Sequence, residues 1–393
     1  MARSIPVLRL KRGREARARV HPWIFKGDVG DVSAADGDVV TVVDAAGRFV
    51  GRGLYNGKPA LCCRILTWND EAIDAPFFAR RVDAALAARA GWTASGPATA
   101  QRIVWSEADG LPGFVADRYG DALVVQCLTL GMARLRGELV KALRARCGEL
   151  PVFAMDDAFA ARLEGFEPAA GWLDTAGPDT VVVDEAGVKL GVRFGTGHKT
   201  GLYLDKTDNR VRIGALARDR DVLDVFAYTG GFACHALAAG ARRAVCVESS
   251  HEAIAGARQN FALNGVAERA EVRDANAFDE LRRLDREPAR FGLVVLDPPP
   301  FARSRTALEA ALRGYKEINL RAMRLLTRGG LLATFSCSHH VSAALFADTC
   351  RAAAADAQII LRLRATLTQS ADHPALLNVP ETAYLKGLLL EAV

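Results

Sequence analysis

The sequence lacks a strong excess of charge and has no long apolar run. Its 51 Lys and Arg residues are nearly balanced by 46 Asp and Glu residues, and the formal net charge of +5 excludes a chain that is basic throughout. No apolar stretch approaches the length of about 18 residues that a membrane span needs, and the basic N-terminal segment has no apolar run of a signal peptide after it. We therefore expect a cytoplasmic protein without membrane contact.

The sequence also lacks any Cys-x-x-Cys pair, although it contains eight cysteines. That spacing is the one most zinc sites use, so we expect no metal site. Most of the cysteines lie in apolar runs, where a reduced thiol packs as a small hydrophobic side chain. A reduced intracellular compartment is favoured over a disulfide framework.

The length of 393 residues predicts two or three domains, and three blocks differ in pattern. Residues 1–75 contain short strand-like runs at 38–43, 49–55 and 60–66, as expected of a small β-barrel. Residues 76–190 predict a compact α+β domain. Its helices are expected at 76–90 and 132–147, its strands at 101–106, 114–117 and 122–128, and a hairpin at 181–184 and 188–194.

Residues 191–393 alternate apolar strands with helices, which is typical of a mostly parallel, doubly wound α/β sheet. The longest helix is expected around 305–327. The strands are expected at 222–226, 243–248, 269–273, 291–297, 330–336, 358–363 and 384–391.

A basic segment lies near the N-terminus, where six Lys and Arg residues surround the single acid Glu15. A solvated face is one interpretation of such a run. The other is a surface that contacts nucleic-acid phosphates, with Arg12 and Arg14 as the residues that we expect to take part.

Acidic residues follow successive strands of the third block, where open α/β sheets bind ligands. Asp224 precedes a turn, Tyr228-Thr229-Gly230-Gly231-Phe232, that lacks the three spaced glycines of a dinucleotide site. This turn suits a neutral, thioether-linked nucleoside better than a pyrophosphate. Glu248 is placed to accept both ribose hydroxyls, and Asp274, beside Ala275, to meet the adenine amine.

Two further segments complete the expected pocket. Residues 197–205 combine cations, hydroxyls and an acid and are followed by Arg210, as charge-assisted hydrogen bonds to a zwitterionic amino-acid tail would require. The Asp297-Pro298-Pro299-Pro300-Phe301 segment must end its strand, because proline cannot donate to a sheet ladder. Phe301 is expected either to stack on a flipped base or to pack in the core.

With these motifs, the chain resembles class I S-adenosylmethionine-dependent RNA methyltransferases, in particular bacterial large-subunit ribosomal RNA cytosine-C5 methyltransferases of the RlmI type. The resemblance covers essentially the whole chain. It rests on residues 107–119, 197–201, 204–205, the Tyr228 turn, 297–299 and 335–338. It implies a PUA domain over 1–75, an α+β linker domain over 76–190 and a Rossmann-like, seven-stranded methyltransferase domain over 191–393.

The resemblance also implies S-adenosylmethionine as cofactor and large-subunit ribosomal RNA as partner. Pro298, Pro299 and Phe301 are expected at the substrate base. The residues expected to hold the cofactor are Lys199, Tyr203, Asp205, Arg210, Asp224, Phe226, Tyr228, Thr229, Gly230, Glu248, Ser249, Asp274, Ala275 and Asp297. The oligomeric state is left open, a homodimer included.

Cys337 follows a strand whose end lies at the same edge as Asp297, so it is the expected catalytic nucleophile. Carbon 5 of cytosine is a poor nucleophile, and addition of a thiolate at carbon 6 would activate it. Asp297 is expected to hold the cytosine N3 or amine. Many RNA cytosine-C5 enzymes carry a second cysteine directly after the Asp-Pro-Pro loop, where this chain has Pro300, so a single-cysteine scheme is implied.

Two alternatives stay open. A guanine N-methyltransferase with a similar Asp-Pro-Pro-x-Phe loop would need no nucleophile. An RNA-binding protein with a catalytically silent methyltransferase fold would need no cofactor. A nicotinamide-dependent oxidoreductase is disfavoured by the Tyr228 turn, and the fold alone does not decide among these functions.

Overall fold

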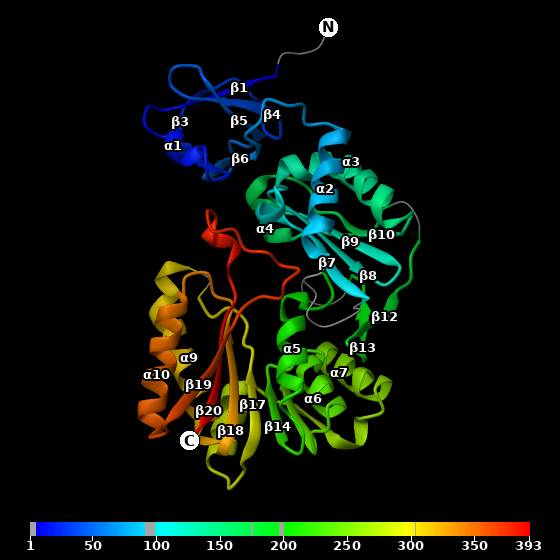
Figure 1. Ribbon diagram of the computed structural model, residues 1–393, viewed down its shortest axis with the longest axis vertical. Coiled ribbons are helices and arrows are strands. Elements are labelled where there is room, and N and C mark those ends of the chain that lie inside the picture. The colour runs from blue at the N-terminus through cyan, green and yellow to red at the C-terminus, as the bar shows by residue number, and fades with distance from the viewer. Residues whose placement is uncertain (1–4, 91–98, 174–175, 196–199, 303) are drawn as a thin grey trace.

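The computed structural model describes residues 5–90, 99–173, 176–195, 200–302 and 304–393. They form three parts that follow one another along the long axis of the molecule, with the N-terminal sheet at one end and the C-terminal α/β sheet at the other (Figure 1). None of the described helices is long and apolar enough to cross a membrane.

The N-terminal part is a six-stranded sheet in the order β2-β6-β5-β4-β1-β3. Its core consists of alternating apolar residues, among them Leu8, Ile24, Val40 and Ile65. The three expected strands are present, and three short ones were missed because each offers only three or four residues of pattern. The bounds are β1 Val7–Leu10, α1 Glu15–Ala18, β2 Trp23–Phe25, η1 Lys26–Asp28, β3 Val29–Val32, β4 Val39–Val43, β5 Phe49–Tyr55 and β6 Leu61–Thr67.

The middle part is a five-stranded sheet in the order β11-β10-β9-β8-β7, packed against helices α2 and α3. Helix α2 begins after Asp74, whose carboxylate accepts the backbone N–H of Phe77 at 3.0 Å as an N-cap. The bounds are α2 Ala75–Arg89, β7 Ala100–Trp105, η2 Ser106–Asp109, β8 Phe114–Tyr119, β9 Ala122–Cys127, α3 Leu130–Cys147, β10 Val152–Met155, α4 Ala158–Glu164 and β11 Ala170–Trp172. Strands β10 and β11 and helix α4 were not expected.

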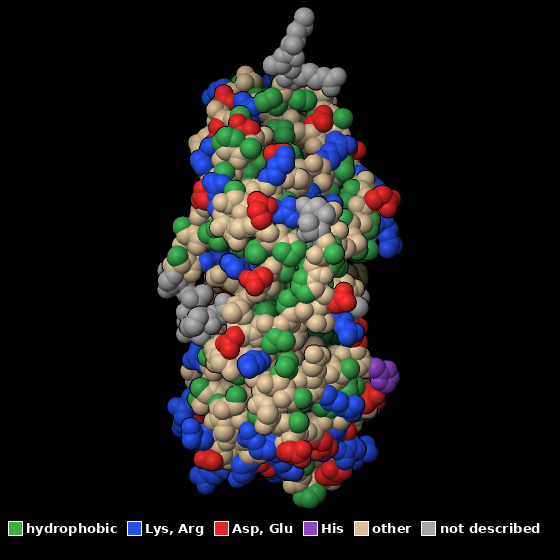
Figure 2. Space-filling model, turned by 90° about the vertical axis from the view of Figure 1, so that its right-hand side faces the viewer, with side chains coloured by type: hydrophobic (Ala, Val, Ile, Leu, Met, Phe, Trp, Pro, Cys, Tyr) green, Lys and Arg blue, Asp and Glu red, His purple; other side chains and the backbone are tan. Residues whose placement is uncertain are grey.

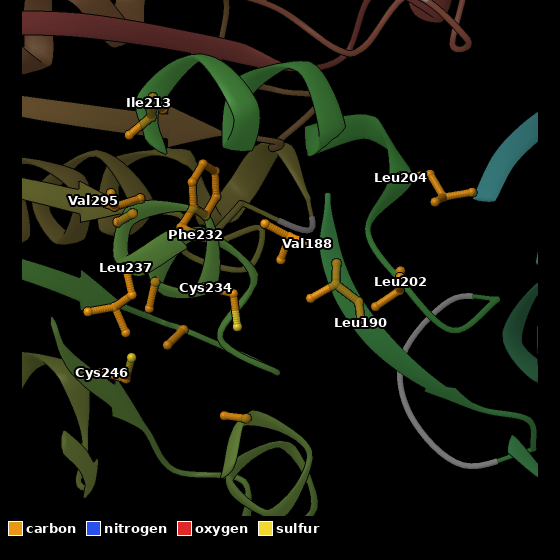
Figure 3. Close-up of a cluster of buried hydrophobic side chains, with 14 of the residues drawn as sticks. Val188, Leu190, Leu202, Leu204, Ile213, Phe232, Cys234, Leu237, Cys246 and Val295 are labelled. Carbon is orange, nitrogen blue, oxygen red and sulfur yellow. The ribbon is translucent and has the colours of Figure 1, made fainter. Parts of the chain in front are cut away.

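The hairpin of β12 (Thr180–Glu185) and β13 (Val188–Arg193) packs on the C-terminal part. Its inward side chains Val188 and Leu190 join the same buried cluster as Phe232 and Leu237 (Figure 3). Backbone N–H groups of β13 also donate to Asn260 of helix α7 (His251–Leu263) and to Asn264, the residue directly after this helix. The hairpin therefore ties the middle part to the sheet that carries the site.

The C-terminal part is a seven-stranded sheet in the order β16-β15-β14-β17-β18-β20-β19 with helices on both faces. The first five strands of this order are parallel, and β20 is antiparallel to both of its neighbours. The strands are β14 Asp221–Val225, β15 Arg243–Glu248, β16 Ala270–Asp274, β17 Phe291–Leu296, β18 Leu326–Ser336, β19 Leu361–Leu367 and β20 Lys386–Ala392. The remaining elements are η3 Leu204–Lys206, α5 Thr207–Gly214, α6 Gly231–Ala238, η4 Ala267–Arg269, α8 Ala277–Asp285, η5 Arg305–Ala307, α9 Leu308–Arg324, α10 Ala343–Ala357 and η6 Pro380–Thr382.

The expected sheet is confirmed, with shifts at its later boundaries. The strand expected at 358–363 is β19, which begins only at Leu361 because α10 runs to Ala357 and Gln358 caps it in the left-handed conformation. The long helix ends earlier than expected, and β18 begins at Leu326 instead of 330. The sequence of 326–330 contains Gly329 and Gly330, which weakened the strand pattern there.

Contacts of the N-terminal part with the rest of the chain are both apolar and polar, and Leu54 and Leu66 belong to the buried cluster of the middle part. Trp23 donates its indole N–H to Glu107 Oε1 of the middle part at 2.9 Å. His21 Nε2 lies 3.2 Å from Glu381 Oε2, which belongs to the loop before β20. Segments far apart in the sequence thus meet where the three parts converge.

Candidate cofactor and catalytic site

The expected site residues gather at one edge of the sheet, where β14, β15 and β17 end. Val225 of β14 is in register with Val247 of β15 and with Leu296 of β17. The residues that follow these positions, Phe226, Glu248 and Asp297, are therefore brought together although they are far apart in sequence. Parallel strands produce this convergence because all their carboxyl ends lie at the same edge.

The turn after β14 is held in an unusual backbone conformation. Phe226, Tyr228 and Gly230 have φ values of 63°, 50° and 74°. A Cβ at Gly230 would lie 2.8 Å from the Phe261 ring, so only glycine fits where helix α6 begins. Two non-glycine residues at positive φ mark a strained turn of the kind that clusters at functional sites.

Glu248 fixes this turn against the end of β15. Its carboxylate accepts the backbone N–H of Tyr228 at 2.9 Å and those of Ser249 and Ser250 at 2.8 and 2.9 Å. Two carboxylate oxygens offer about four acceptor positions, so Glu248, which is half-buried, retains capacity for a ligand hydroxyl. This arrangement suits the expected ribose contact.

Asp274 lies beside Glu248 on the next strand, and the two residues are in register. It is exposed, and its Oδ2 lies 3.2 Å from Nδ1 of His251. Ala275 donates its backbone N–H to the carbonyl of Glu248 at 3.1 Å. The structure therefore places both residues next to Glu248, with Asp274 on the solvent side.

Asp224 is buried under the turn. Its Oδ2 accepts the N–H of Ala233 at 3.2 Å, and its Oδ1 has no hydrogen-bond partner among the described residues. Burial, aided by the negative charges of Asp297 and Glu248, raises the pKa of Asp224 to about 7. A buried carboxylate oxygen without a partner is an acceptor for a cationic ligand group, and the ammonium of an amino-acid tail fits that need.

Arg210 was expected to contact the cofactor, but the structure places it in a buried ion pair. Its Nε and Nη2 each lie 2.6 Å from the carboxylate of Glu185, and its Nη1 donates to the carbonyl of Tyr203 at 2.9 Å. Glu185 also lies 2.9 Å from Nε2 of His235. Because these partners engage the guanidinium, Arg210 supports the Tyr203 segment from behind, a role that corrects the expected direct contact.

The segment before α5 carries Tyr203 and Asp205. The Tyr203 ring meets the Tyr228 ring edge-on at 5.2 Å, and Asp205 Oδ2 accepts the hydroxyl of Tyr384 at 2.7 Å. Asp205 is buried, so it faces the protein and not the solvent. Lys199, together with residues 196–198, lies outside the described residues.

Asp297 at the end of β17 forms an ion pair with Lys206, a residue that sequence reasoning missed. The Lys206 side chain is buried, and its Nζ lies 4.8 Å from the centroid of the Phe335 ring. A buried lysine is rare unless it is paired. Its position directly after Asp205 was the only signal in the sequence.

Cys337 follows β18, at the same edge as Asp297. Its Sγ lies 3.8 Å from the carbonyl oxygen of Pro298, and the residue is half-buried. Six of the other seven cysteines are buried, and Cys147 is distant in sequence and lies in the middle part. The structure therefore brings together the two residues expected to be catalytic.

The exposure of the Asp-Pro-Pro-Pro-Phe segment changes along its length, and Pro298 is buried. Pro299 and Pro300 are exposed, whereas Phe301 is half-buried. The Phe301 ring lies 4.6 Å from the Tyr315 ring, with Phe278 and Phe226 also in contact. Aromatic packing holds Phe301, so stacking on a flipped base is disfavoured and the exposed loop face consists of prolines.

The basic N-terminal segment is on the surface, and Arg12 and Arg14 are both exposed. Arg14 Nε lies 3.5 Å from Asp28 Oδ1, and Arg9 Nε lies 3.4 Å from Asp31 Oδ1. On the face drawn in Figure 2, Lys and Arg side chains occur over the whole length of the molecule, interspersed with Asp and Glu. On this face, positive charge is therefore distributed and not confined to one large patch.

The fold and the site together define a class I methyltransferase. The sheet is mostly parallel, with a strained turn after its first strand, an acid at the end of its second and an Asp-Pro-Pro loop after its fourth. The family model of S-adenosylmethionine-dependent methyltransferases matches residues 158–390. A PUA-like domain model matches residues 8–68.

Relatives and solved structures that are similar to this chain identify its family within this class. The ribosomal RNA large subunit methyltransferase I of Alteromonas mediterranea is 38% identical over 98% of both chains. That of Shewanella denitrificans is 39% identical over 97% of this chain and 98% of its own. An S-adenosylmethionine-dependent methyltransferase from Streptococcus mutans has the same fold, with a TM-score of 0.84 at 18% identity over 99% of this chain and 100% of its own. Another solved methyltransferase, in complex with SAH, has a TM-score of 0.86, again at 18% identity over 99% of this chain and 100% of its own.

The chain therefore belongs to the family of the ribosomal RNA large subunit methyltransferases I, within the S-adenosylmethionine-dependent methyltransferases. Its cofactor is S-adenosylmethionine. No group of three or more His, Cys, Asp or Glu side chains that could hold a metal ion occurs among the residues with described positions.

Proposed function

We propose that the chain methylates carbon 5 of a cytosine in large-subunit ribosomal RNA through a covalent adduct with Cys337. The observation that carries this proposal is the position of Cys337, 3.8 Å from the Pro298 carbonyl at the edge where the site acids meet. The names of the relatives support ribosomal RNA of the large subunit as the substrate.

In the proposed reaction, Cys337 and Asp297 have different roles. The Cys337 thiolate adds to carbon 6 of the cytosine, which makes carbon 5 nucleophilic. S-adenosylmethionine, when bound, supplies an electrophilic methyl group on its sulfonium. Loss of the carbon-5 proton restores the double bond to carbon 6 and expels the cysteine. Asp297, which forms an ion pair with Lys206, accepts a hydrogen bond from the cytosine amine and orients the base.

The cofactor contacts form part of the same proposal. Glu248 binds the ribose hydroxyls, Asp224 accepts from the ammonium group, and Asp274 and Ala275 meet the adenine. The rings of Phe226 and Tyr203 and the turn 228–230 are proposed to enclose the thioether, with Ser249 and Asp297 as further contacts. Cofactor contacts of Lys199 and of the buried Asp205 stay predictions. Arg210 acts here only by holding the Tyr203 segment.

The exposed basic segment supplies RNA affinity. Arg12 and Arg14 are proposed to contact phosphates, because both are exposed on the PUA-like part. Residues 1–75 would thus bind RNA, 76–190 would link, and 191–393 would catalyse. The exposed Pro299 is proposed to face the target base, whereas Pro298, also expected there, is buried.

The proposal is tested by methyl transfer from labelled S-adenosylmethionine to unmodified bacterial ribosomal RNA. The wild type is compared with Cys337→Ala and, as a matched control, with the buried and distant Cys350→Ala, and the product nucleoside is identified. Labelled 5-methylcytosine that disappears only in Cys337→Ala is the expected result.

A guanine N-methyltransferase is the second candidate, because it needs only the Asp-Pro-Pro loop and no nucleophile. A labelled guanine that persists in Cys337→Ala would establish this alternative. No transfer and no S-adenosylmethionine binding by the wild type would instead identify a catalytically silent RNA-binding protein.

A further inference from the structure

Cys337 is flanked by two lysines that differ in how their charge is compensated. Lys206 forms an ion pair with Asp297, as described above. Lys386 lies at the start of β20 and has no carboxylate within ion-pairing distance among the residues that the structure describes. Within that part of the chain, Lys386 is therefore a cation of this site whose charge no carboxylate compensates.

The position of Lys386 is set by the strand pairing and by two hydrogen bonds. Its backbone is directly opposite Ser336 in the antiparallel β18–β20 ladder. Its Nζ donates to the carbonyl of Ser338 at 2.7 Å and to that of Tyr384 at 2.8 Å. The side chain thus spans residue 337, from Ser336 on one side to Ser338 on the other.

We propose that Lys386 is a positioning residue that favours the thiolate form of Cys337, because its ammonium group is held on the carbonyl of the adjoining Ser338. This inference rests on the proposed role of Cys337 as the nucleophile. Carbonyl oxygens occupy two of the three N–H donors of the ammonium group, so its orientation is fixed and one donor remains available. A thiolate and not a thiol is the attacking species, which makes this charge relevant to the rate.

The charges in the site are consistent with this assignment. Burial lowers the pKa of Lys386, and a negative charge at Cys337 raises it again. The two groups therefore stabilise each other's charged forms. In contrast, the thiol faces the Pro298 carbonyl oxygen, which cannot stabilise a negative sulfur.

Other titratable groups near Cys337 do not change charge in the pH range where thiols titrate. Burial raises the pKa of Tyr203 and of Tyr315, so both stay neutral. Burial lowers the pKa of His339, so the imidazole is neutral at the pH values at which thiols titrate. Among the residues with described positions, the charged groups that remain around the thiol are Lys386, Lys206, Asp297 and Asp205.

The test measures the pH dependence of alkylation at Cys337 by iodoacetamide, with the modified peptide quantified by mass spectrometry. The variants are Lys386→Met, which removes charge and donors, Lys386→Gln, which keeps donors only, and Lys386→Arg, which keeps both. Lys189→Met is the matched control, because Lys189 is an exposed residue of β13 whose loss changes net charge equally. Cys147, half-buried in the middle part, is the internal reference in every sample.

We expect the Cys337 thiol pKa to rise by about one unit in Lys386→Met and Lys386→Gln, with about tenfold less thiolate below that pKa. Lys386→Arg and Lys189→Met should keep the wild-type profile. At pH values below the thiol pKa, the rate of methyl transfer in Lys386→Met and Lys386→Gln should also fall below that of the wild type. The difference in rate should become smaller as the pH increases. If Lys386 acted only through its hydrogen bonds, Lys386→Gln, which keeps donors, would show the wild-type pH profile of Cys337 alkylation.

A Cys337 profile that is unchanged in both Lys386→Met and Lys386→Gln would overturn this inference. That outcome is independent of the proposed function, because alkylation requires neither RNA nor cofactor. Methyl transfer that survives in Cys337→Ala would instead refute the proposed function. The two failures are therefore distinguishable in the same set of proteins.

Discussion

Glu185 is the residue whose loss should most weaken the support of the site. Its side chain is 1% exposed and accepts four hydrogen bonds, from Arg210 Nε and Nη2 at 2.6 Å each, Thr207 at 2.8 Å and His235 at 2.9 Å. The charge of Arg210 holds the pKa of Glu185 well below its usual range despite burial. Glu185→Gln would leave the buried guanidinium uncompensated.

The expected cost of Glu185→Gln is about 3–5 kcal/mol, the range measured when one partner of a buried ion pair is removed. Urea unfolding followed by circular dichroism measures this loss, and hydrogen exchange should locate it in β12 and α5. The matched control is Glu138→Gln, which removes an exposed pair with Lys141 and should cost at most about 0.5 kcal/mol. Glu185→Met combined with Arg210→Met should recover much of the loss, because no unpaired charge remains.

The sign of the pH dependence follows from the same pair. Because the pKa of Glu185 is lower in the folded state, its contribution is present at neutral pH and is lost as pH falls below the ordinary range of a glutamate. A cost below about 1 kcal/mol for Glu185→Gln at pH 7, or a double variant as unstable as the single one, would refute the reasoning.

The remaining predictions concern the cofactor and the RNA. Because the pKa of Asp224 is raised to about 7, its carboxyl group keeps a proton between pH 4 and 7 in the folded state, whereas the unfolded state has released it. Above pH 7 the buried negative charge destabilises the fold, so Asp224→Asn should stabilise the cofactor-free protein at pH 8 by roughly 2–4 kcal/mol. By calorimetry, wild-type affinity for S-adenosylmethionine should be about tenfold weaker at pH 6 than at pH 8, whereas Asp224→Asn should bind weakly at both; equal wild-type affinities would contradict this role. Replacing Arg12 and Arg14 by Gln should lower RNA affinity and reduce the salt slope by about 1.5, with cofactor affinity unchanged, as filter binding over a salt series would show; an unaltered slope would remove both residues from the interface.

Sequence reasoning recovered the elements whose signals are local. The strands of the C-terminal sheet are runs of apolar residues with turn residues after them, and such patterns do not depend on distant contacts. The strands β1 to β3 were missed because they are short and only partly buried. The site acids were found because open α/β sheets place ligands at strand ends, a rule that needs only strand order.

What the sequence by itself determined is the class of fold, the edge of the sheet that carries the site and the cysteine that lies there. The tertiary structure alone decided which charges are compensated. Nothing near Glu185 in the sequence indicates Arg210 or His235, and nothing near Lys206 indicates Asp297. It also decided that Phe301 packs against Tyr315 and that Lys386 spans Cys337. The physical reason is that burial and pairing depend on which segments the fold brings within a few ångströms, and a one-dimensional pattern does not contain those distances.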